Sequence, residues 1–136
     1  MAAILECVPN FSEGRDMNII KQITDEIESV DGVKLLDVDP GKATNRTVVT
    51  FVGEPEPVIE AAYLAIKKAS EVIDMSQQTG EHPRMGATDV CPFIPIANIT
   101  MEETAEALRV SERTAHRLWG FARAWLRREI EKDLAE

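Results

Sequence analysis

The sequence lacks several features that mark common protein classes. No apolar run approaches the roughly 20 residues of a membrane-spanning helix, so we expect no membrane span. Residues 1–5 reach Glu6 before a signal-peptide core has formed, which predicts a cytoplasmic protein. Basic residues are outnumbered, with 15 Lys and Arg against 24 Asp and Glu, and the net charge is −9. Such a chain repels phosphate, which argues against nucleic-acid or anionic-membrane binding as its main role.

Cysteines are also scarce. Cys7 and Cys91 lie far apart in apolar segments, and the sequence contains no CxxC motif and no cluster of Cys and His. We therefore predict two buried free thiols, with no metal site and no disulfide. Apolar residues make up 44% of the 136 positions, which is ordinary for a single globular domain.

The composition changes near residue 100. Residues 1–100 carry 16 acids and 8 bases, whereas residues 101–136 carry 8 acids and 7 bases. The second segment also holds both tryptophans and six of the nine arginines. We therefore predict two parts, an α/β unit over residues 1–101 and a helical tail over residues 102–136.

The first part alternates between strand and helix patterns. Runs rich in apolar and β-branched residues predict strands at 4–8, 33–38, 47–52 and 90–96. Apolar residues at helical spacing predict helices at about 15–30 and 58–73. The order β-α-β-β-α-β predicts an α/β (α+β) fold, a ferredoxin-like sheet with two helices on one face. Prolines inside the last run place that strand at a sheet edge.

The other face of this sheet is expected to be covered as well. Leu35, Val38, Val48 and Val52 leave apolar side chains on both faces of the predicted strands. A sheet face that is not polar needs a second layer. We therefore expect a partner on this face, and a second copy of the chain is one candidate.

The longest connection, residues 76–89, contains a cluster of groups able to do chemistry. His82 can transfer a proton near neutral pH, and Arg84 can hold a carboxylate through two parallel hydrogen bonds. Connections of this length are usually functional or disordered. From the residues alone, the alternative is a histidine that hydrogen-bonds only within its own loop.

Two other connections are open to a structural or a functional interpretation. Residues 10–15 follow a strand and open a helix, so their N–H groups could bind an anion. A plain helix cap by Ser12 is the favoured alternative. Residues 39–45 are predicted to form a turn, in which Asp39 either shapes the turn or lines a site.

The tail is predicted to be a pair of helices. Thr100 and Glu103 have the spacing of a capping box, which predicts a short helix from residue 101. Ser111 can cap a longer helix that reaches about residue 133.

Residues 1–100 resemble the N-terminal subdomain of the formiminotransferase family. The motifs that carry the resemblance are ECVPNFSEG (6–14), LLDVD (35–39), TNRT (44–47), TFVG (50–53), IDMS (73–76), GEHPRMG (80–86) and DVCPFIP (89–95). In that family the histidine of the EHPRMG motif is the catalytic acid and base, and here it is His82. The family transfers a formimino group from N-formimino-L-glutamate to tetrahydrofolate, its co-substrate, in histidine breakdown.

The resemblance also implies a mechanism and a missing part. His82 would take the proton from the folate nitrogen that attacks the formimino carbon. By residue type, Arg46 or Arg84 would hold a glutamate carboxylate and Asp39 would orient the histidine. In the family the folate lies between two stacked α/β subdomains. This chain does not continue into the second one, so we expect weak turnover or none from it alone.

Residues 102–136 resemble the helix-turn-helix at the end of extracytoplasmic-function sigma factors. The motifs are ETAEAL (103–108), VSERT (110–114) and WGFARAWL (119–126), and the DNA-facing residues would be Ser111, Arg113, Thr114 and Arg117. DNA would then be a partner. Equally favoured is a helical pair that closes the sheet, because a tail of net charge −1 is a poor match to DNA. A third reading is a folded chimera with no preserved activity.

Overall fold

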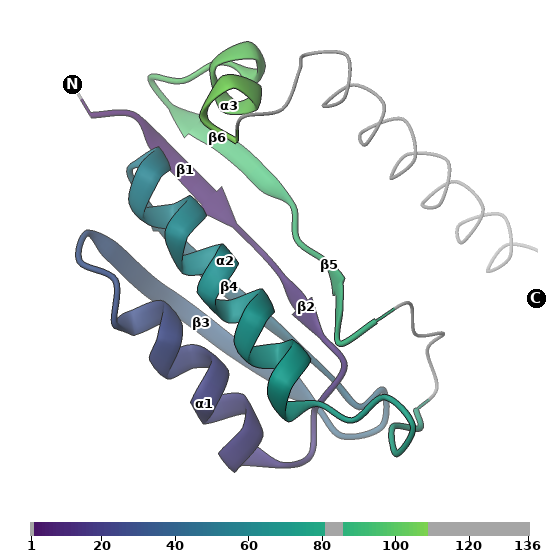
Figure 1. Ribbon diagram of the computed structural model, residues 1–136. Coiled ribbons are helices and arrows are strands. Elements are labelled where there is room, and N and C mark those ends of the chain that lie inside the picture. Colours follow the sequence, from purple (N-terminus) through teal and green to yellow (C-terminus); the bar gives the residue numbers. More distant parts are fainter. Residues whose placement is uncertain (1, 81–85, 109–136) are drawn as a thin grey trace, which may run out of the picture. The chain divides into compact units, whose positions relative to one another are not determined.

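The computed structural model describes residues 2–80 and 86–108, and all structural statements below refer to them (Figure 1). The chain divides into two compact units, Met1–Ile99 and Thr100–Glu136, and each is described by itself. Six residues with predicted roles lie outside the described residues: His82, Arg84, Ser111, Arg113, Thr114 and Arg117.

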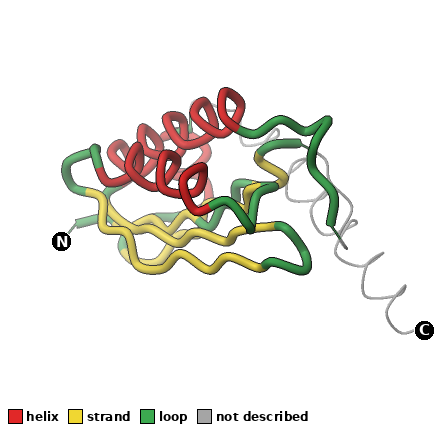
Figure 2. The backbone as a smooth tube through the Cα atoms, turned by 90° about the horizontal axis from the view of Figure 1, so that it is seen from below, coloured by secondary structure: helices red, strands yellow, loops and turns green. Residues whose placement is uncertain are grey.

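The first unit is a mixed α/β structure built on one antiparallel sheet. Its elements are β1 (Ile4–Cys7), β2 (Asn10–Phe11), α1 (Met17–Glu28), β3 (Val33–Gly41), β4 (Arg46–Gly53), α2 (Pro55–Val72), β5 (Thr88–Val90) and β6 (Phe93–Ala97). The strand order is β5-β2-β4-β1-β6, and β3 pairs with β4 beside this path. Helices α1 and α2 lie side by side over one face of the sheet (Figures 1 and 2).

The sheet contains two strand breaks. The first predicted strand ends at Cys7 as β1, and after Val8 and Pro9 the chain forms β2, which pairs with β4 as β1 does. The last breaks at Cys91 and Pro92 and becomes β5 and β6. Each break contains a proline, which has no N–H to give to a ladder. The breaks are adjacent, because the Val8 N–H donates to the Pro92 carbonyl at 3.2 Å.

Several local predictions are corrected by the structure. Asn10 and Phe11, which were predicted to lie in a turn, form β2. Ser12 does not cap α1; Asp16 does, with its carboxylate accepting from the Asn18 N–H at 2.9 Å. The turn predicted at residues 39–45 starts later than expected, because β3 runs through Gly41 and Asp39 pairs with Val48 inside the sheet.

The core lies between the sheet and the two helices. Along β4 every second side chain, Thr47, Val49 and Phe51, is buried, whereas the residues between them are partly exposed. The face of α2 toward the core is lined with small residues, which lets the helix lie close to its neighbours: Ala61, Ala62, Ala65 and Ala69. Burial of the helix-covered face of the sheet supplies the apolar core on which the stability of the fold depends.

The second unit begins with α3 (Met101–Ala107). The predicted capping box is confirmed: Thr100 Oγ1 accepts from the Glu103 N–H at 3.1 Å, and the Glu103 carboxylate accepts from the Thr100 N–H at 3.2 Å. The rest of the predicted helical pair lies outside the described residues. Over residues 2–80 and 86–108, no helix is both long and apolar enough to cross a membrane.

Candidate functional site

A cavity of about 240 Å³ opens at the end of the β3–β4 hairpin, and its lining residues are Asn10, Asp39, Gly41, Thr44, Arg46 and Val48. The strand register explains why these residues meet. Val48 of β4 lies opposite Asn10 of β2 on one side and Asp39 of β3 on the other. Directly paired residues share a face of the sheet. Since Thr47 and Val49 point into the core, the cavity lies on the opposite face, which we call the open face.

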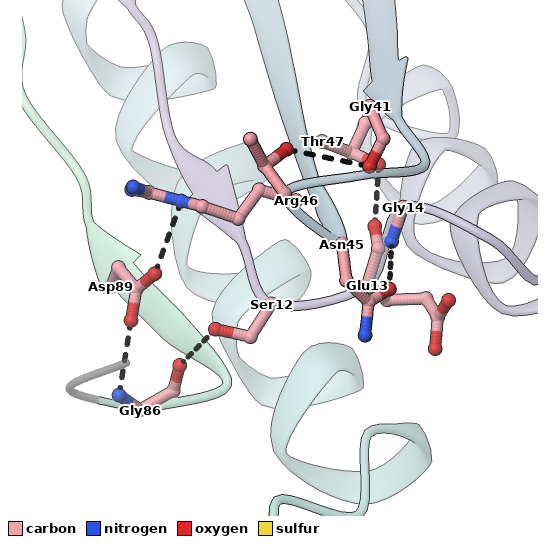
Figure 3. Close-up of polar contacts among 10 residues, drawn as sticks. Ser12, Glu13, Gly14, Gly41, Asn45, Arg46, Thr47, Gly86 and Asp89 are labelled. Carbon is pink, nitrogen blue, oxygen red and sulfur yellow. Dashed lines mark hydrogen bonds and ion pairs between the residues drawn. The ribbon is translucent and has the colours of Figure 1, made fainter. Parts of the chain in front are cut away.

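Arg46 is the cation of this cavity. Its Nε lies 3.3 Å from Asp89 Oδ2, and the two side chains are only 17% and 5% exposed. The other carboxylate oxygen, Asp89 Oδ1, accepts from the Gly86 N–H at 3.2 Å. The ion pair therefore connects the wall of the cavity to the start of β5, as Figure 3 shows. A guanidinium held on one edge keeps further N–H donors for a carboxylate ligand.

A buried carboxylate lies at the turn between β2 and α1. Glu13 is 4% exposed, and its Oε1 accepts from the backbone N–H groups of Arg15 and Asp16, each at 2.8 Å. Its Oε2 accepts from the Gln78 amide at 2.9 Å. The Arg15 and Asp16 N–H groups, which lie in the segment considered for anion binding, therefore donate to the protein's own carboxylate.

Asn45 joins the same cluster from the β3–β4 hairpin. Its φ of 52° is in the left-handed region, which asparagine tolerates better than most residues. Its Oδ1 accepts from the Gly14 N–H at 2.8 Å, and its Nδ2 donates to the Gln78 side chain and to the Thr79 carbonyl. A Cβ on Gly14 would lie 2.3 Å from the Gly41 carbonyl oxygen, so only glycine fits where the backbone of residue 14 passes the β3–β4 hairpin.

These contacts hold both described flanks of the segment 81–85. On one side, Gln78 and Thr79 are bound by Asn45, as described above. On the other side, the Ser12 hydroxyl donates to the Gly86 carbonyl at 2.7 Å (Figure 3). The Ser12 N–H donates to the Ala87 carbonyl at 2.9 Å. The β3–β4 hairpin and the residues before α1 thus hold the described chain on either side of segment 81–85.

The structure brings together two of the four residues that the sequence analysis assigned to the site. Asp39 and Arg46 line one cavity, whereas His82 and Arg84 lie outside the described residues. The cluster of Glu13, Asn45 and Gln78 was missed. Two of its members lie in motifs that the sequence analysis quoted: Glu13 in ECVPNFSEG and Asn45 in TNRT, each beside a predicted turn. Within residues 2–80 and 86–108, no group of three or more His, Cys, Asp or Glu is placed to hold a metal ion.

The cysteines are free, as predicted, but only Cys7 is fully buried and Cys91 is partly exposed. Their Sγ atoms lie 3.5 Å apart. The sequence analysis did not anticipate this contact, because the two positions are far apart along the chain and meet only through pairing of β1 with β6.

Comparison with known proteins identifies the family. The model of the formiminotransferase domain, N-terminal subdomain, matches residues 4–123 and so reaches into the tail. The formimidoyltransferase-cyclodeaminase of Dictyostelium discoideum is 59% identical over 103 residues, which are 76% of this chain and 19% of that protein. The mouse (Mus musculus) protein of the same name is 57% identical over 103 residues, which are again 76% of this chain and 19% of that protein.

A shorter relative matches as well. The glutamate formimidoyltransferase of Streptococcus pyogenes serotype M1 is 48% identical over 118 residues, which are 87% of this chain and 38% of that protein. The matched region thus spans about a fifth to two fifths of these relatives. On the family match and these identities, the chain belongs to the formiminotransferase family and corresponds to its N-terminal subdomain.

Proposed function

We propose that this chain takes part in transfer of a formimino group from N-formimino-L-glutamate to tetrahydrofolate, with His82 as the general acid and base. Membership of a family whose relatives are named formimidoyltransferases supports the reaction. The observation that carries the site is the cavity on the open face, which holds a carboxylate, Asp39, and a cation, Arg46, on adjacent strands.

The proposed chemistry assigns one task to each group. His82 accepts the proton from the tetrahydrofolate nitrogen while that nitrogen attacks the formimino carbon, and a tetrahedral adduct forms. The histidine then returns the proton to the glutamate nitrogen, the bond from carbon to that nitrogen breaks, and glutamate leaves.

Arg46 binds a carboxylate of the substrate, a role that Arg84 can share, and Asp39 orients the histidine. The ion pair with Asp89 supports this role for Arg46, because it restricts the side chain before the substrate arrives.

The proposal extends to the arrangement of the sheet. If β1 with β2 and β5 with β6 each count as one interrupted strand, the order becomes β3, β4, β1/β2, β5/β6. This is the order of a ferredoxin-like sheet with two helices on one face. The antiparallel pairing of every adjacent strand in the described sheet supports it.

We also propose that the open face is covered in the working enzyme, by a second subdomain or by a second copy of this chain. Register places four apolar side chains on this face, and two of them are more than a third exposed: Val48, Val52, Val90 and Ile94. An apolar patch of this kind is typical of an interface. Static light scattering tests the second copy, and a monomer at high micromolar concentration would exclude it.

A transfer assay tests the reaction. Absorbance of the folate product is followed for the wild-type chain, for His82→Ala and for His116→Ala, which removes the only other histidine. We expect transfer above the uncatalysed rate that is abolished in His82→Ala and retained in His116→Ala. Equal rates above the uncatalysed rate for the wild-type chain and His82→Ala would contradict the assignment of the acid and base. No transfer by either protein would contradict the proposal that this chain catalyses the reaction by itself.

A further inference from the structure

The two sulfur atoms lie where the interrupted strands meet. Cys7 ends β1 and is fully buried, whereas Cys91 lies between β5 and β6 and is partly exposed. The backbone on either side is already joined, because Cys7 pairs with Phe93 and the Val8 N–H donates to the Pro92 carbonyl at 3.2 Å. The thiols therefore face each other across a fixed junction, with Sγ atoms 3.5 Å apart.

We propose that Cys7 and Cys91 are a reversible modification site, which a hydroperoxide oxidises to an intramolecular disulfide. A disulfide needs the sulfur atoms about 2.05 Å apart, so they must approach by roughly 1.5 Å. Rotation of the Cys91 side chain can supply much of this movement, since Cys91 lies in a connection and not within a strand.

The environments of the two thiols assign them different tasks. The hydrogen bond from the Cys7 S–H lowers the pKa of Cys91, although burial opposes this effect. The same hydrogen bond and burial raise the pKa of Cys7. Cys91, partly exposed and with the lower pKa, is therefore the thiol that reacts first with a small oxidant. Cys7, which the oxidant cannot reach directly, is the one that completes the bond.

The proposed steps balance in atoms and electrons. The Cys91 thiolate attacks one peroxide oxygen, so that the S–O bond forms as the O–O bond breaks. Hydroxide is the leaving group, and Cys91 becomes a sulfenic acid. Cys7 then attacks the Cys91 sulfur, the S–S bond forms, and the hydroxyl of the sulfenic acid leaves as water with the Cys7 proton. The thiol pair gives two electrons to the peroxide, and a small thiol can return them by exchange.

The disulfide would act on the wall of the candidate site. Asn10, which lines the cavity, is three positions after Cys7, and Asp89, which pairs with Arg46, is two positions before Cys91. A covalent link between the strand breaks fixes these two segments to each other. Closing so long a loop also restricts the unfolded chain, so we expect the oxidised form to melt roughly 5 °C or more above the reduced form.

Peroxide titration of the reduced full chain tests this inference. With one equivalent of hydrogen peroxide, we expect loss of both thiols, a mass lower by two hydrogens, a Cys7–Cys91 crosslinked peptide, and full reversal by dithiothreitol. Cys91→Ser should leave Cys7 unreactive, and Cys7→Ala should leave Cys91 to form higher oxyacids. Three results with the wild-type chain would each overturn the proposal: oxyacids on Cys91, a disulfide between two chains, or survival of both thiols. The wild-type result decides the question even if a variant fails to fold.

Discussion

The two faces of β4 differ in what their side chains do. Thr47, Val49 and Phe51 point to the helices and are at most 1% exposed, whereas Arg46 and Val48 alternate with them and line the cavity. One strand of eight residues thus serves both packing and the candidate site. Successive residues of a strand face opposite sides of the sheet. Substitutions on the helix-covered face should therefore lower stability, and substitutions on the open face should weaken binding.

The largest effect is expected on the covered face. Phe51→Ala removes a side chain that is fully buried, and the cavity left behind should lower the free energy of unfolding by about 3–5 kcal/mol. Val48→Ala, the matched substitution on the open face, should cost less than about 1 kcal/mol because Val48 is only partly buried. Urea unfolding of both variants measures the difference, and equal losses would remove the distinction between the faces.

The next effect concerns the buried cluster that holds the flanks of segment 81–85. Glu13→Gln replaces an acceptor of three N–H groups with an amide whose NH₂ group faces that of Gln78. We expect a loss of about 1–3 kcal/mol in unfolding free energy and faster hydrogen exchange at Thr79 and Gly86. The control is Glu28→Gln on the exposed end of α1, which should leave both unchanged. Unaltered exchange in Glu13→Gln would show that the cluster does not hold the flanks.

A smaller free-energy change should appear in substrate binding. Arg46→Lys keeps the charge but loses the planar guanidinium, so affinity for N-formimino-L-glutamate should fall about tenfold, or about 1.4 kcal/mol. Isothermal titration calorimetry measures this loss. The control is Arg15→Lys, because the exposed Arg15 Nε donates to the Lys42 carbonyl at 2.9 Å and Arg15 is not among the residues that line the cavity. Undiminished affinity in Arg46→Lys would remove Arg46 from the binding site.

The smallest effect is expected at the surface of α1. Lys21 and Asp25 form an exposed ion pair at 2.9 Å, and the hydrogen bond to Asp25 raises the pKa of Lys21. A raised pKa in the folded state means that any stabilisation is present below the ordinary lysine pKa and disappears as pH rises through the folded value. The difference in urea midpoint between Lys21→Ala and Lys67→Ala, an exposed lysine of α2, should therefore be largest near neutral pH and shrink as pH rises above the ordinary lysine pKa of about 10.4. A difference that grows at alkaline pH would contradict this sign.

Much of the fold follows from periodicity, which is a local property of the sequence. Both helices of the first unit and the middle two strands appear close to their expected positions, and the Thr100 capping box is present as predicted. The short strand after Pro9 was missed, because a proline excludes a ladder hydrogen bond without showing whether the chain returns to the sheet beyond it. Only the pairing of both strands with β4 shows that β1 and β2 follow one path.

The candidate site was harder to predict because its contacts are long-range. Asp39 and Arg46 were assigned by residue type, and the register that puts them around one cavity comes from pairing of β3 with β4. Glu13 and Gln78 are 65 positions apart, so no spacing rule connects them. The contact of Cys7 with Cys91 was missed for the same reason.

The claim that the site lies on the open face is tested most directly by amide chemical shifts. The ¹⁵N-labelled chain is titrated with N-formimino-L-glutamate, and each shift is assigned to a residue. We predict saturable shifts at Asp39, Gly41, Arg46 and Val48, with none at Ala61 and Ala65 in α2. Shifts confined to the helices, or none at the cavity residues, would contradict the account.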